Sequence, residues 1–204
     1  MSKQLLIDCI PFEISPTLLN EIKVAGPNSL LIVKGVLQRA DSENQNGRTY
    51  AKKILEREIE NYKKNFVNER RAVGELDHPE KSIIELKNVS HNITEIHWEG
   101  DDVVGTVEIL TTPAGNILRE LIKNGIKIGI SSRALGSVTE GRNGTKVVGD
   151  DLSLICWDFV SNPSTSGAWM NPTNLNEGID NNITTKNSKL EELVRDLIIE
   201  IGSK

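Results

Sequence analysis

The sequence is poor in cysteine, with only Cys9 and Cys156 among its 204 residues. These two lie far apart and neither belongs to a Cys-x-x-Cys pattern, so we expect no disulfide framework and no four-thiolate zinc site. Such cysteine usage is typical of a reducing compartment. The sequence also lacks a phosphate-cradling glycine loop of the P-loop or dinucleotide type, and we expect no cofactor.

Long apolar runs, aromatic residues and excess positive charge are also missing. No stretch approaches 18 consecutive apolar residues, and residues 1–15 lack a basic region followed by an apolar core, so we expect neither a membrane span nor ordinary secretion. Aromatic residues make up 4%, and 24 Lys and Arg stand against 29 Asp and Glu, which gives a net charge of -5. Neither base stacking nor bulk electrostatics therefore favours nucleic acid binding.

The composition predicts a globular chain, because hydrophobic residues reach 37% and charged residues 26%. We expect an α+β fold with a core of Ile, Leu and Val. Strand-like composition occurs at residues 30–37, 71–77, 89–98, 103–110, 126–131, 146–148 and 152–160. Residues 40–49 are rich in turn formers, and we expect a loop there. The first 27 residues are expected to form a peripheral arm on a domain that spans residues 1–170.

Two segments have helical periodicity. Residues 50–66 carry one apolar stripe, with Thr49 as the expected N-cap; its members are Leu55, Ile59, Tyr62 and Phe66. Residues 112–125 begin with Thr112 and Pro113 and end at Gly125, which is the usual punctuation of a helix. Residues 171–188 are rich in Asn and Thr and predict a linker, and residues 189–204 predict a helical tail.

His78 is the first residue that could carry chemistry. It ends a predicted strand and precedes Pro79, which restricts its backbone and suits a general base. A loop histidine without a function is the alternative. Glu75, Asp77 and His78 could also begin a metal site, although no second histidine motif completes it. We interpret His91 and His97 as ordinary strand positions.

Two adjacent serines, Ser131 and Ser132, end a strand between glycines and could provide a nucleophile. Strand alternation distinguishes them, because Ser132 shares the face of Ile128 and Ile130, which should point into the core. Ser131 lies on the opposite face, where Gly129 leaves room for a substrate backbone. Ser131 is therefore the predicted nucleophile, and a turn that needs glycine and serine only for its geometry is the alternative.

Asp158 lies in a strand that is apolar on both faces, where an unpaired carboxylate would cost several kcal/mol. It should therefore have a partner, and two are open: a catalytic imidazole that it orients, or an arginine such as Arg133 in a structural ion pair. Cys156, two residues earlier, would be an inert thiol because an apolar environment raises its pKa.

Three motifs in this order resemble a known family: Asn-x-Asn-Gly-Arg-Thr-Tyr at residues 44–50, Gly-Glu-Leu-Asp-His-Pro at 74–79 and Gly-Ile-Ser-Ser-Arg-x-Leu-Gly at 129–136. The family is that of the prohead core protein proteases of T-even-type tailed bacteriophages. The resemblance covers about residues 30–172. It implies a serine endopeptidase with a fold like that of the herpesvirus assemblins, which is a mixed, mostly antiparallel β-barrel flanked by helices.

The resemblance also implies site residues. The family's histidine and serine correspond to His78 and Ser131, and the third member is carried over to Asp158 from the Asp-x-Val-x-x-Pro stretch at 158–163. Oxyanion donors would come from backbone N–H groups of a loop at residues 133–136. These four residues, which would also contact substrate, are Arg133, Ala134, Leu135 and Gly136.

The implied partners are scaffold (core) proteins and the major capsid protein, cleaved in the host cytoplasm inside the prohead, and a homo-oligomer is compatible with the sequence. Family members cut after Glu with an aliphatic residue two positions earlier, and finally cut themselves. Matching triplets in this tail end at Glu177, Glu192 and Glu200. A non-catalytic module of the same fold that binds capsid or scaffold is the alternative.

Overall fold

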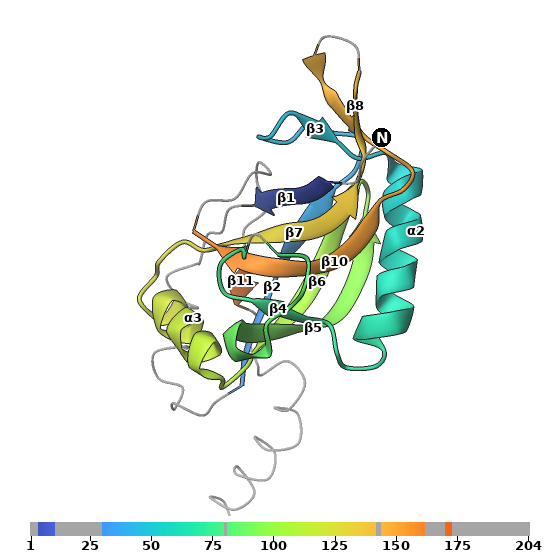
Figure 1. Ribbon diagram of the computed structural model, residues 1–204. Coiled ribbons are helices and arrows are strands. Elements are labelled where there is room, and N and C mark those ends of the chain that lie inside the picture. The colour runs from blue at the N-terminus through green and yellow to red at the C-terminus, as the bar shows by residue number, and fades with distance from the viewer. Residues whose placement is uncertain (1–3, 11–29, 80, 142–143, 162–169, 173–204) are drawn as a thin grey trace, which may run out of the picture. The chain divides into compact units, whose positions relative to one another are not determined.

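A computed structural model describes residues 4–10, 30–79, 81–141, 144–161 and 170–172 (Figure 1). The chain divides into a first unit that ends at residue 173 and a second that follows it. All described residues belong to the first unit. The predicted helical tail at 189–204 and all of the predicted linker except residues 171–172 lie outside the described residues, as do the three candidate cleavage sites.

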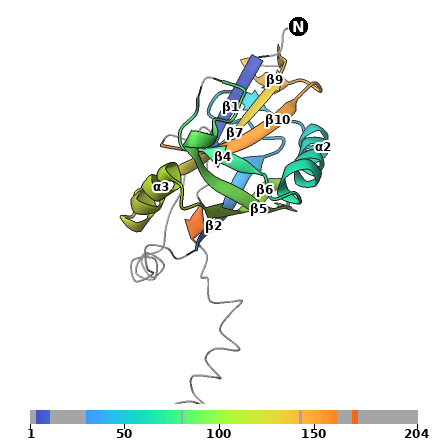
Figure 2. The ribbon, with the colours of Figure 1, turned by 60° about the horizontal axis from the view of Figure 1, so that its bottom comes forward.

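Strands dominate the described unit. They are β1 (Gln4–Ile10), β2 (Leu31–Arg39), β3 (Arg48–Thr49), β4 (Val73–Glu75), β5 (Val89–Glu99), β6 (Asp102–Ile109), β7 (Gly129–Gly136), β8 (Val138–Glu140), β9 (Lys146–Val148), β10 (Ser153–Val160) and β11 (Asn171–Pro172). The helices are α2 (Lys52–Tyr62) and α3 (Pro113–Lys123), with a π-helical turn at Lys63–Val67 and a 3₁₀ turn at Leu86–Asn88. Figures 1 and 2 show α2 and α3 on opposite sides of the strands.

The described strands form three sheets. Five strands have the order β11-β2-β6-β5-β4, three have the order β1-β7-β10, and the short β3, β9 and β8 make a third sheet. Every pairing between these strands is antiparallel except that of β3 with β9. The predicted α+β class with mostly antiparallel strands is therefore confirmed, and no closed barrel is found among the described strands.

The main core contains side chains from both larger sheets. Trp157 and Phe159 of β10 and Ile130 of β7 pack in one cluster with Ile93 of β5 and Val107 of β6. All five are at most 1% exposed, and burying side chains of this size stabilises a fold by about 1.5–3 kcal/mol each. The three-stranded sheet thus packs on a fully buried apolar layer.

The two helices follow their predicted stripes with local differences. In α2 the predicted stripe is buried at Leu55, Ile59 and Tyr62, but the N-cap is Ala51 rather than Thr49. Thr49 belongs to β3, whose pairing with β9 takes that residue out of the helix. In α3 the prediction of Thr112 as N-cap is confirmed, since its hydroxyl accepts a hydrogen bond from the Gly115 N–H at 3.0 Å.

The largest departures from the predicted elements concern β1 and β7. The strand expected at 126–131 begins only at Gly129 and continues to Gly136, and Ile126 is 47% exposed. Residues 4–10, expected in a peripheral arm, instead form β1, which pairs with β7 along its whole length. Asp8 of β1 is buried and accepts hydrogen bonds from Tyr50 and Asn46, so the first motif serves to hold β1 against the sheet.

His91 in β5 is fully buried and has a structural role. Its ring lies between the Ser90 hydroxyl (2.8 Å) and the Trp157 carbonyl (3.0 Å) and packs edge-on against Phe159. Burial lowers the pKa of His91 to about 4 from an ordinary value of 6.5. The imidazole is therefore neutral in the folded protein near neutral pH.

This burial predicts an acid-sensitive fold. Because the unfolded chain binds a proton at His91 near pH 6.5 and the folded chain only near pH 4, its contribution to stability is full above pH 6.5 and is lost as the pH falls toward 4. Between pH 7 and pH 5 we expect a loss of about 2 kcal/mol from this residue. Urea unfolding at both pH values should show this loss in the wild type and a smaller one in His91→Gln; equal losses in the two proteins would contradict it.

Candidate active site

His78 owes its position to a sharp bend after β4. Glu75 ends the strand, and Asp77 has a φ of 65°, in the left-handed region that turns the chain abruptly. The backbone is held at this bend because the Asp77 N–H donates to the Phe159 carbonyl at 2.8 Å and Leu76 forms an isolated parallel bridge with Phe159. His78 is thereby held beside β10.

Ser131 lies in the middle of the three-stranded sheet. It is fully buried on β7, and the strand register places it directly opposite Asp158 of β10. Directly paired residues in an antiparallel sheet project to the same face, so the hydroxyl and the carboxylate share one face. Ser132 is paired with Trp157 and Asp8, and its hydroxyl has no hydrogen-bond partner among the described residues.

The three predicted residues meet in a hydrogen-bonded chain. His78 Nε2 is hydrogen-bonded to Ser131 Oγ, and His78 Nδ1 lies 2.8 Å from Asp158 Oδ2. A carboxylate at Nδ1 favours the tautomer with the proton on that nitrogen, which directs the lone pair of Nε2 toward the serine hydroxyl. The His78 side chain is 12% exposed, whereas that of Asp158 is fully buried.

Asp158 is ionised in this environment. Burial alone would raise its pKa, but the hydrogen bond from His78, the charge of Arg133 and the N–H of Glu75 together lower the pKa below the ordinary value of 3.8. The Glu75 N–H donates to Asp158 Oδ1 at 2.9 Å. The carboxylate therefore keeps its charge and can stabilise an imidazolium.

Both partners left open for Asp158 are present at once. Besides the His78 ring, the Arg133 guanidinium contacts it, with Nε 3.0 Å from Oδ2 and Nη2 3.1 Å from Oδ1. Cys156 lies beside this pair, and burial raises the pKa of its thiol well above the ordinary value of 9.0, which agrees with an inert thiol.

The predicted loop at residues 133–136 is wrong. These residues are the second half of β7, and the strand continues because β1 and β10 pair with it on both sides. A strand paired on both sides directs its N–H groups into the two ladders, which disfavours Ala134, Leu135 and Gly136 as oxyanion donors. The Arg133 guanidinium is occupied by the Glu75 and Asp158 carboxylates and the Lys81 carbonyl, which disfavours it as a substrate contact.

The proposed metal ligands do not converge. Glu75 is fully buried and directed to Arg133, with Glu75 Oε2 2.6 Å from Arg133 Nη2, whereas Asp77 is exposed. Among the described residues no group of three or more His, Cys, Asp or Glu side chains is arranged to hold a metal ion. Of the other histidines, His91 is the structural residue described above, and His97 is hydrogen-bonded to Glu99 at 2.9 Å.

Glu75 is the site residue that sequence reasoning assigned to the wrong chemistry. The sequence suggests it only as a metal ligand, but its carboxylate is the second counter-charge of Arg133. The available signal was Arg133 itself, since a guanidinium buried in a strand requires counter-charges and Glu75, three residues from His78, is a carboxylate that could supply one.

A serine hydroxyl, an imidazole and a buried carboxylate joined in series are the arrangement on which serine hydrolases rely. Comparison with known proteins gives the family. Residues 6–180 match the family model described as "Prohead core protein serine protease", so the chain belongs to the prohead core protein serine protease family. It is a prohead-associated phage protease with a role in capsid maturation, which confirms the resemblance found in the sequence.

A sequence match and a solved structure, both from phage T4, support this assignment. The prohead core protein protease of Enterobacteria phage T4 is 32% identical over 150 residues, which is 72% of this chain and 71% of that protein. The solved structure of the bacteriophage T4 capsid assembly protease gp21 matches with a TM-score of 0.68 and 28% identity, over 79% of this chain and 99% of that chain. No helix among the described residues is long and apolar enough to cross a membrane.

Proposed function

We propose that this chain is a serine endopeptidase in which Ser131 is the nucleophile, His78 the general base and Asp158 the residue that orients the imidazole. The observation that carries this proposal is the continuous hydrogen-bonded chain from Ser131 Oγ through both ring nitrogens of His78 to Asp158. His78 takes the hydroxyl proton as Oγ attacks the scissile carbonyl, which gives a tetrahedral intermediate, and Asp158 stabilises the imidazolium. The protonated ring then gives this proton to the leaving amine, so that the C–N bond breaks and an acyl-enzyme is left. Water, deprotonated by His78, attacks this ester and releases the new C-terminus and the free Ser131 hydroxyl.

The proposed substrates are the scaffold proteins and the major capsid protein of the prohead, cleaved in the host cytoplasm inside that particle. The family membership supports capsid or scaffold proteins as substrates. We further propose cleavage after Glu with an aliphatic residue two positions earlier, and self-cleavage at Glu177, Glu192 or Glu200, where the tail carries such triplets. We also propose that the two larger sheets close into a barrel; the bridge between Leu76 and Phe159, which joins the segment after β4 to β10, supports this closure. We propose in addition that the chain forms a homo-oligomer.

One digestion tests both the substrate class and the specificity. The purified chain is incubated with the scaffold proteins of its own phage, and the new termini in the scaffold and in the chain are identified by mass spectrometry. We expect new C-termini at Glu in both proteins and none with the Ser131→Ala variant. An intact tail after complete digestion of the scaffold would contradict self-cleavage, and no Ser131-dependent cleavage at all would favour the non-catalytic alternative.

A further inference from the structure

Arg133 is a charged residue of the site that the proposed mechanism leaves unused. Its side chain is fully buried. Its Nη2 donates to Asp158 Oδ1 at 3.1 Å, and its Nε lies 3.0 Å from Asp158 Oδ2 and donates to Cys156 Sγ at 3.3 Å. Nη2 also lies 2.6 Å from Glu75 Oε2, and Nη1 donates to the Lys81 carbonyl at 2.9 Å. One guanidinium thus contacts three separate parts of the site.

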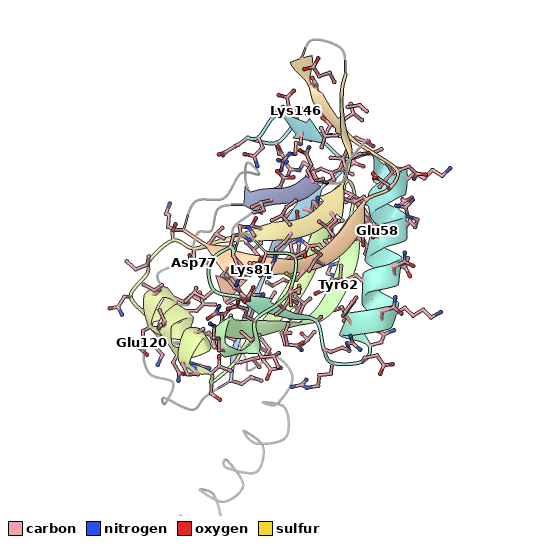
Figure 3. All side chains as sticks on the ribbon, in the orientation of Figure 1. Glu58, Tyr62, Asp77, Lys81, Glu120 and Lys146 are labelled. Carbon is pink, nitrogen blue, oxygen red and sulfur yellow. The ribbon has the colours of Figure 1, made fainter. Side chains whose placement is uncertain are left out.

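These contacts hold the segment that carries His78 at two points. Glu75 lies three residues before His78 and Lys81 three residues after it, and Arg133 binds both. Figure 3 labels Asp77 and Lys81, which both lie next to strands β7 and β10 in that view. The other Glu75 oxygen, Oε1, accepts the N–H of Glu85 at 3.0 Å, which fixes the chain further along. The fully buried Glu75–Arg133 pair therefore holds the His78 segment on the sheet together with the backbone contacts of Leu76 and Asp77 to Phe159.

Arg133 and the backbone N–H of Glu75 fix the rotation of the Asp158 carboxylate. Oδ1 accepts from Glu75 N–H and Arg133 Nη2, so Oδ2 is directed to His78 Nδ1. A buried cluster of one positive and two negative charges is costly to desolvate and contributes little net stability compared with apolar residues of the same volume. The main effect of this charge cluster is therefore on the geometry of His78 and Asp158 rather than on the stability of the fold.

We propose that Arg133 and Glu75 are positioning residues of the peptidase reaction: they hold the His78 segment and the Asp158 carboxylate in the geometry that proton transfer from Ser131 requires. This inference rests on the proposed function. The Arg133 guanidinium is occupied by Glu75, Asp158 and the Lys81 carbonyl, and the Glu75 carboxylate by Arg133 and the Glu85 N–H, so both act through His78 and Asp158. Their loss should therefore reduce kcat and leave KM unchanged.

The test compares two chemically identical substitutions, Glu75→Gln and Glu58→Gln. Both carboxylates are buried and each accepts one backbone N–H, from Glu85 at 3.0 Å for Glu75 and from Leu154 at 3.1 Å for Glu58. The Glu85 N–H and Arg133 bind different oxygens of Glu75, so in a glutamine one of these two donors would face the NH₂ group. We expect Glu75→Gln to lower kcat about 10²-fold, the usual cost of misplacing a reacting group by about 1 Å, and Glu58→Gln to keep it.

The readout is kcat and KM from steady-state kinetics on a Glu-containing peptide. Each kcat is divided by the folded fraction of that variant, which is measured by thermal unfolding. Arg133→Lys is the second variant, because it keeps the charge but cannot span both Asp158 oxygens and reach Lys81, and we expect a similar loss of kcat. Unchanged kcat in both variants, or an effect on KM alone, would overturn the inference. A wild-type protein without Ser131-dependent activity would instead overturn the proposed function.

Discussion

The Ser131→Ala variant is expected to lose peptidase activity by a factor of about 10⁴ or more in kcat. Among the three hydrogen-bonded side chains of the proposed triad, only Ser131 Oγ can form the acyl-enzyme. His78 cannot replace it as a nucleophile in the same geometry. KM should change little, because the substitution removes one oxygen and leaves the paired backbone of β7 in place. Initial rates with a Glu-containing peptide measure this effect.

Ser132→Ala is the matched control for this prediction. The two serines are neighbours on β7 and are both buried, but the Ser132 hydroxyl has no partner among the described residues, so its removal costs no hydrogen bond there. We expect this variant to retain wild-type kcat and equal or slightly higher stability. Full activity in Ser131→Ala combined with loss in Ser132→Ala would show that strand alternation selects the wrong serine.

The Asp158→Asn variant should lower kcat by about 10⁴-fold, the scale seen when the carboxylate of such a triad becomes an amide. An amide that accepts from Arg133 and Glu75 N–H presents its NH₂ group to His78 Nδ1, which favours the tautomer with the proton on Nε2. That ring cannot accept the proton of Ser131. The measurement is kcat for the folded protein, with unfolding curves to determine the folded fraction.

Asp8→Asn separates this catalytic effect from the cost of altering a buried carboxylate. Asp8 and Asp158 lie on the two strands that flank β7, paired with Ser132 and Ser131 respectively, and both are buried. Burial raises the pKa of Asp8, and hydrogen bonds from Tyr50 and Asn46 stabilise its charged form. We expect Asp8→Asn to lower stability but to keep kcat per folded molecule, and equal kcat losses in the two variants would argue against a special role of Asp158.

Much of the site follows from local sequence rules. Period-two alternation on β7 distinguishes Ser131 from Ser132, and the cost of an isolated carboxylate in an apolar strand requires a partner for Asp158. The bend at His78 is visible in the sequence as a strand that ends before proline. These features depend only on residues next to one another in the chain.

The rest depends on pairings between distant segments. Residues 133–136 resemble a turn because Gly and Ser surround them, and only β1 on one side and β10 on the other make them a strand. The N-terminal residues resemble an arm because the partners of Asp8 are more than 35 positions away, at Asn46 and Tyr50. Arg133 contacts Glu75 across 58 positions, so its structural role could not be deduced from its neighbours.

The most direct test of the central claim is to react the protein with a phosphonate that modifies activated serines and to locate the adduct by peptide mass spectrometry. The claim is that His78 activates Ser131 through their hydrogen bond. We predict one adduct, on Ser131, formed by the wild type and by Ser132→Ala but not by His78→Ala. An adduct on another serine, or modification of Ser131 at an undiminished rate in folded His78→Ala, would contradict the account.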